Sequence, residues 1–71
     1  MSMTEKIKIA LIKRNMSVTE LANILGSTPQ NLSAKFRRDN FCEKDLQEIA
    51  IALNCRFEAN FIDNITGETL T

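Results

Sequence analysis

With 71 residues, 44% of them hydrophobic and 25% charged, the chain has the length of one small globular domain. Its longest apolar run, residues 49–53, is far shorter than the ~20 residues of a membrane-spanning helix. The first residues also lack the basic-then-apolar order of a signal peptide, so we expect a cytoplasmic protein without a membrane partner.

The net charge of zero hides two halves of opposite sign. Residues 1–38 carry seven basic and two acidic side chains, a net charge of +5. Residues 39–71 carry two basic and seven acidic side chains, a net charge of −5. Such segregation indicates one basic face, which suits a nucleic-acid partner. Ordinary solvated helix faces give the same pattern, so charge alone leaves both interpretations open.

The reactive side chains argue against an enzyme. The chain has no histidine and no tyrosine, and no glycine-rich phosphate loop is apparent. We therefore expect no catalytic residue, no cofactor, no metal ion and no small-molecule substrate. The two cysteines, Cys42 and Cys55, are expected to be free thiols, at least one of them packed.

Capping residues predict the first two helices. The first is expected over Thr4–Arg14, with Thr4 as its N-cap. Asn15 is expected to end it, because asparagine tolerates a left-handed backbone. The second follows Ser17, which can form a capping box with Glu20. It ends at Gly26, where a positive φ costs little.

Two further helices follow after short connections. The third has Thr28 as its N-cap and Pro29 at its first position, and it closes at Asp39. The fourth is expected over Glu43–Leu53, with Asn54 as its stop. The apolar residues that these three helices are expected to bury, by their helical spacing, are Leu21, Ala22, Ile24, Leu25, Leu32, Phe36, Leu46, Ile49, Ala50 and Leu53.

The C-terminal tail changes from helical to alternating periodicity. In residues 56–61 apolar and polar side chains alternate, which predicts a half-buried strand, and residues 68–71 are expected to return as a second short strand. The favoured interpretation is that Phe57, Ala59 and Phe61 pack on the helices. The alternative is an exposed strand edge that pairs with a second chain and forms a dimer.

Residues 17–38 form the most informative unit, a helix, a three-residue turn and a second helix. A connection this short forces the two helices to cross steeply, and Ala22 is small enough for their close approach. The polar side of the later helix is then exposed and flanked by basic residues. Such a helix fits the DNA major groove, which is ~12 Å wide.

This unit resembles the Cro/phage-repressor (xenobiotic-response-element) family of helix-turn-helix proteins. The resemblance covers about residues 5–55 and is carried by Met16, Ser17, Glu20, Leu21, Ala22, Leu25, Gly26, Leu32, Ser33, Leu46, Ile49, Ala50 and Leu53. It implies a mainly α fold, a four- to five-helix lambda-repressor-like DNA-binding domain with a short C-terminal β-strand or hairpin. It also implies double-stranded DNA as partner and a homodimer. The domain would span residues 1–55, followed by the extended tail 56–71.

The resemblance assigns site residues on the third helix and at the starts of the second and third. Those expected to read bases are Gln30, Asn31, Ser33 and Ala34. Those expected to contact phosphates, by resemblance or by charge, are Ser17, Thr19, Thr28, Lys35, Arg37 and Arg38. The three basic residues at the end of the third helix could equally complement its dipole, and Ser17 serves first as a cap.

The sequence therefore predicts a sequence-specific, DNA-binding transcriptional regulator that reads the major groove with its third helix. The alternative is a protein-interaction module that keeps the helix-turn-helix fold without specific DNA binding. The zero net charge, Val18, Pro29 and the amphipathic tail favour this alternative.

Overall fold

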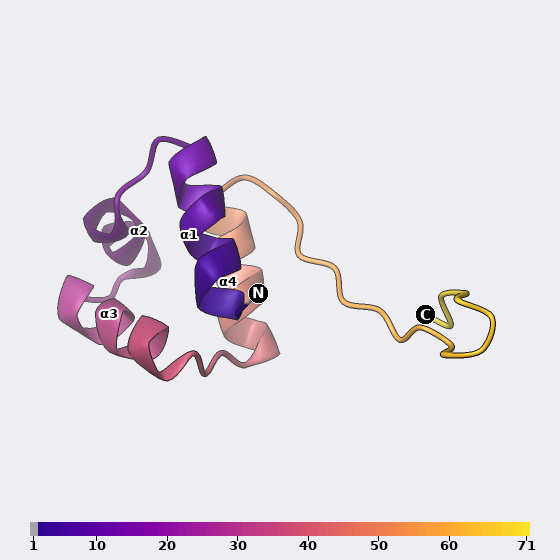
Figure 1. Cartoon of the computed structure of the whole chain (residues 1–71). Coiled ribbons are helices and arrows are strands. Elements are labelled where there is room, and N and C mark those ends of the chain that lie inside the picture. Colours follow the sequence, from indigo (N-terminus) through magenta and orange to yellow (C-terminus); the bar gives the residue numbers. More distant parts are fainter. Residues whose placement is uncertain (1) are drawn as a thin grey trace.

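The computed structural model describes residues 2–71, in which four helices pack together and the C-terminal residues extend away from them (Figure 1). The helices are α1 (Met3–Lys13), α2 (Val18–Leu25), α3 (Pro29–Arg38) and α4 (Glu43–Ala52). A mainly helical fold is thus confirmed. None of the helices within residues 2–71 has the length and apolar character needed to cross a membrane.

The caps of α2 and α3 lie where the sequence predicts them. The Ser17 hydroxyl accepts a hydrogen bond from the Glu20 N–H, and the Glu20 carboxylate accepts one from the Ser17 N–H. Gly26 ends α2 with a φ of 70°, in the left-handed region that favours glycine. Thr28 caps α3, with Pro29 in the first helical turn, where no N–H is needed.

The expected cap of the first helix is wrong. Ser2, not Thr4, caps α1 and forms a capping box with Glu5. The Thr4 N–H donates instead to the Asp39 carboxylate over 2.8 Å, and the Thr4 hydroxyl lies 2.8 Å from both that carboxylate and the Phe36 carbonyl oxygen. Thr4 therefore joins the start of α1 to the end of α3. These hydrogen bonds, the backbone one first, lower the pKa of Asp39 below its ordinary value.

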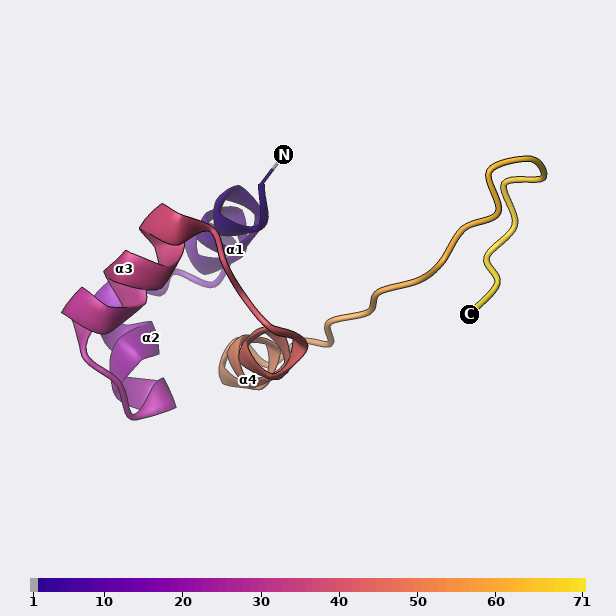
Figure 2. The same ribbon diagram turned by 90° about the horizontal axis from the view of Figure 1, so that it is seen from below.

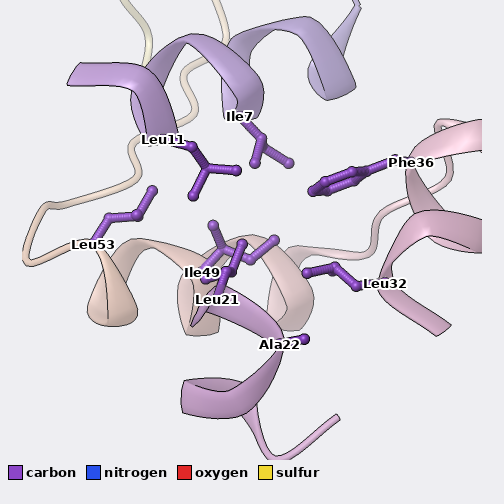
Figure 3. Packing of buried hydrophobic residues seen from close by; sticks show 8 residues of the cluster. All are labelled: Ile7, Leu11, Leu21, Ala22, Leu32, Phe36, Ile49 and Leu53. Carbon is purple, nitrogen blue, oxygen red and sulfur yellow. The ribbon is translucent and has the colours of Figure 1, made fainter. Parts of the chain in front are cut away.

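All four helices contribute to one apolar core (Figure 3). The side chains that meet there are Ile7 and Leu11 of α1, Leu21 and Ala22 of α2, Leu32 and Phe36 of α3, Ile49 of α4, and Leu53, which follows α4. Ile24 was expected to be buried as well, but its side chain is more than half exposed. With about 3.6 residues per helical turn, Leu21, Ala22 and Leu25 share the core-facing side of α2, and Ile24 falls outside it.

The turn between α2 and α3 has the geometry expected of the short connection. Ala22 has no exposed surface, and its carbonyl oxygen accepts a hydrogen bond of 2.9 Å from the Ser27 N–H. In Figure 2, α2 and α3 lie at an angle to one another on the same side of the bundle. The small Ala22 side chain allows this approach, and the turn holds α3 in a fixed position at the surface.

The tail does not form the expected strand. Residues 55–61 are extended but belong to no strand, and the β-pairing within residues 2–71 is a single antiparallel bridge between Ile62 and Thr69. Phe57 is half-buried, whereas Ala59 and Phe61 are exposed, so the expectation that all three pack on the helices is wrong. A two-stranded ribbon is marginal on its own, and this one lies away from the helices (Figures 1 and 2).

Both thiols are also placed differently from the expectation. Cys42 and Cys55 are free, as predicted, but both are exposed, so neither is the packed thiol that was expected. Cys42 occupies the N-cap of α4, where its N–H donates to the Asp45 carboxylate.

Two isoleucines of α4 provide a matched test of this core. Ile49 is 5% exposed and Ile51 is 77% exposed, and the same substitution changes helix propensity equally at both. We expect Ile49→Val to lower the free energy of unfolding by about 1 kcal/mol and Ile51→Val by less than about 0.5 kcal/mol. Urea denaturation measures both values, and equal losses would contradict the described core.

Candidate nucleic-acid interface

Helix α3 carries most of the predicted site residues, and its buried side fixes which of them face outward. Leu32 and Phe36 are buried against the other helices. The Thr28 hydroxyl accepts a hydrogen bond of 3.1 Å from the Asn31 N–H and so holds the first turn. The outward side chains therefore project from a helix that is packed along one side and capped at its start.

Three predicted residues come together on one side of α3. Gln30, Ser33 and Arg37 line a shallow surface hollow beside Pro29, at the i, i+3, i+7 spacing of a single helix face. Gln30 and Arg37 are exposed and Ser33 is half-buried. We call this the Arg37 face. Among residues 2–71, no acidic side chain lines this hollow.

The Arg37 face continues onto α1 and the start of α2. Ser33 and Arg37 line a second shallow hollow together with Lys8 and Val18. The Lys8 ammonium lies 6.0 Å from the centre of the Phe36 ring, which places it close to α3. Two basic side chains from different helices, Lys8 and Arg37, thus share one surface.

Lys8 was not among the predicted site residues. One feature of the sequence could have indicated Lys8 as a site residue. It directly follows Ile7, which is buried, so it lies at the edge of the core-facing side of α1. Its neighbour Arg37 comes 29 positions later in the chain. Their proximity depends on how α1 packs against α3, which local patterns do not reveal.

Other predicted residues lie on the opposite flank of α3, which faces α4. Asn31 and Lys35 line a hollow together with Asp45 and Glu48. The Lys35 ammonium is paired with the Asp45 carboxylate at 2.6 Å. The structure therefore separates Asn31 and Lys35 from the Arg37 face and places them beside acidic side chains.

The remaining site residues are spread along the two helices. Ala34 is half-buried, and Arg38 is exposed in the last turn of α3. At the start of α2, Thr19 is exposed, while Ser17 is engaged in the capping box. The Glu20 carboxylate accepts a hydrogen bond from the Ser17 N–H, so a negatively charged group already lies at this helix start.

Asp45 is the most perturbed acid of this region. The hydrogen bond from Lys35 is the largest cause, and the Cys42 N–H adds to it, so the pKa of Asp45 falls from 3.8 to about 2. The carboxylate is therefore ionised at neutral pH and holds Lys35 in place. This ion pair joins the acidic half of the sequence, residues 39–71, to the basic half, residues 1–38.

Comparisons with known protein families, with curated proteins and with solved structures found no match. Within residues 2–71, no three side chains of the metal-binding types gather closely enough to hold a metal ion.

The lowered pKa of Asp45 leads to a prediction about acid stability. Because the folded-state pKa lies below the ordinary value, the ionised carboxylate stabilises the fold above pH 3.8, and this stabilisation is lost as the pH falls toward about 2. We expect Asp45→Asn to cost about 1 kcal/mol at pH 7, because it removes an exposed ion pair and weakens the α4 cap.

Urea denaturation at several pH values tests this expectation. The stability difference between wild type and Asp45→Asn should shrink as the pH falls from about 4 toward 2. A difference that is constant over this range would contradict the assignment. Lys35→Met is the companion variant, because it removes the partner of Asp45 and should weaken the same pH dependence.

Proposed function

We propose that this protein is a sequence-specific, DNA-binding transcriptional regulator that inserts α3 into the major groove. The observation that carries the proposal is the Arg37 face, in which Gln30, Ser33 and Arg37 project from a capped, packed helix beside Lys8. A groove ~12 Å wide admits an α-helix, and α3 is attached to the bundle by its opposite side. The sequence resemblance to the Cro/phage-repressor family agrees with this proposal.

Each side chain of the Arg37 face has a role that fits its chemistry. The Gln30 amide offers one donor side and one acceptor side, which matches the pair that adenine presents in the major groove. Arg37 and Lys8 would neutralise phosphates on either side of the groove. Ser33, halfway along the face, can donate to or accept from a base edge.

The other predicted residues differ in how directly they could contact DNA in this proposal. Arg38 is exposed and remains a candidate phosphate contact, as do Thr19 and the capping hydroxyl of Thr28. Lys35 must first leave Asp45 before it can reach a phosphate. Asn31 and Ala34 would contribute only where the groove edge approaches the sides of α3.

A protein-interaction module is the second candidate, and one observation favours it. Ile24 and Ile51 are both more than half exposed and line a hollow between α2 and α4 together with Leu25 and Ala52. A protein partner that used this surface would leave the Arg37 face free. DNA binding and this alternative are therefore separable by mutation.

Salt dependence separates the two flanks of α3. Each neutralised phosphate contributes about 0.9 to the slope of log K against log salt concentration. We expect Arg37→Ala to reduce this slope for random duplex DNA by about 0.9, and Lys35→Ala to reduce it less, because Asp45 already holds Lys35. Fluorescence anisotropy at several salt concentrations gives the slopes. Equal losses, or none with Arg37→Ala, would contradict the placement of the interface.

Base reading by Gln30 is tested after selection of a preferred duplex from a random library. We expect Gln30→Ala to weaken binding to that duplex by about 1–3 kcal/mol and to relax the preference at one base pair. Asn31→Ala is the matched control, since Asn31 lies on the flank that faces α4. If the Asn31 variant loses specificity and the Gln30 variant does not, the wrong side of α3 has been assigned.

A further inference from the structure

A hollow lined mainly by apolar side chains lies between α1 and α4. Met3 and Ala10 of α1 line it together with Leu46 and Ala50 of α4. Within residues 2–71 it shares no lining residue with the two hollows of the Arg37 face. The tail leaves the helices at this hollow, on the side away from α2 and α3 (Figures 1 and 2). The proposed DNA interface therefore leaves the hollow unused.

The start of the tail forms one wall of the hollow. Cys55, Arg56 and Phe57 all line it, and Phe57 is half-buried. The Gln47 side-chain amide of α4 donates to the Phe57 carbonyl oxygen over 3.4 Å, so this wall is fastened to the helix beside it. Within residues 2–71, no residue beyond Phe57 lines the hollow, and its mouth stays open.

The charged side chains at the hollow are both basic. Lys6 of α1 and Arg56 of the tail line it and are exposed, and within residues 2–71 no acidic side chain does so. Lys6 takes part in no ion pair among these residues, while the Arg56 Nε lies 2.9 Å from the Glu58 carboxylate. A guanidinium has five N–H donors, so the two Nη groups of Arg56 can still bind a second carboxylate. The hollow therefore has an apolar interior and a positive rim.

The size of the hollow limits what it can hold. It encloses about 150 Å³, and an engineered apolar cavity of about this volume binds benzene, a ring of six carbons. Small-molecule sites are commonly apolar with a few polar groups that fix the orientation of the ligand. A small hydrocarbon group with an anionic head matches both the interior and the rim, whereas a cationic head would be repelled by Lys6 and Arg56.

We propose that this hollow binds a small amphipathic carboxylate, with a hydrocarbon part of about six to eight carbons against α1 and α4. The carboxylate lies at the rim, where the Lys6 ammonium and the Arg56 guanidinium neutralise it. The ligand is bound and not converted, so no catalytic residue is needed. The proposal does not depend on DNA binding.

An NMR titration of the methyl-labelled full chain with sodium octanoate tests this site. Octanoate should give saturable shifts of the Ala10, Leu46 and Ala50 methyl signals. The signals of Ile24 and Ile51, which are exposed apolar residues elsewhere, should stay unchanged. No saturable shift, or equal shifts at all five residues, would overturn the proposal, because a hollow filled by the tail or a general surface effect would then explain the result.

A series of ligands separates the contributions of the interior and the rim. From butyrate to octanoate the affinity should rise by up to about fourfold for each added methylene, and decanoate should gain little once the hollow is full. Octylammonium has the same chain as octanoate with the opposite charge, so it should bind roughly tenfold more weakly or less. Equal affinity of the two head groups, or no dependence on chain length, would overturn the proposed ligand class.

Two lysines of α1 provide matched variants. Lys6→Gln should raise the octanoate dissociation constant about threefold and reduce the preference for octanoate over octylammonium. Lys13→Gln removes the same charge from an exposed position outside the hollow and should leave both values unchanged. Helical circular dichroism should be the same for both variants. Equal effects of the two substitutions would overturn the placement of the carboxylate.

The two free thiols give an independent measurement on the unmodified sequence. Both are exposed, but Cys55 lines the hollow and Cys42 does not. Octanoate should therefore slow the alkylation of Cys55 by iodoacetamide and leave the rate at Cys42 unchanged. Peptide mass spectrometry gives both rates in one sample. Equal slowing of the two thiols, or no slowing at Cys55, would overturn the proposal.

Discussion

The packing of Leu21 and Ala22 beneath α3 is the constraint on which the rest of the structure depends. Both side chains have no exposed surface, and they belong to the helix that contacts both α3 and α4. A larger residue than Ala22 would push α3 away, and a residue other than glycine at Gly26 would strain the turn. Because α3 packs against α2, Leu32 and Phe36 are buried in the core, and the Arg37 face lies at the surface.

The positions of the charged side chains matter more for this surface than the net charge of the chain. The chain is neutral, but Asp45 of the acidic half holds Lys35 of the basic half at 2.6 Å. One flank of α3 is thereby neutralised, and the basic side chains that remain unpaired on α3 within residues 2–71 are Arg37, with Lys8 beside it, and Arg38. A count of charges in the sequence would have assigned Lys35 and Arg37 the same availability.

Local patterns were sufficient for the helices and insufficient for contacts between them. The partners in the Ser17–Glu20 box lie three positions apart, as do Thr28 and Asn31 at the start of α3, so both caps could be predicted. Thr4 was misassigned because its partner, Asp39, lies 35 residues away. The division of α3 into two flanks escaped prediction for the same reason, since it requires knowing which helix lies on each side. The alternation of residues 56–61 indicates strand character, but a strand needs a partner that the single chain does not supply.

An NMR titration of the labelled protein with a random DNA duplex at low salt tests the central claim most directly. The proposed interface predicts that the amide signals that shift first belong to the starts of α2 and α3 and to the Arg37 face, including Val18, Gln30 and Arg37. It also predicts that the signals of Ile24 and Ile51, across the bundle between α2 and α4, stay unchanged. Shifts confined to those two residues and their neighbours, or no shifts at all, would contradict a DNA-binding α3.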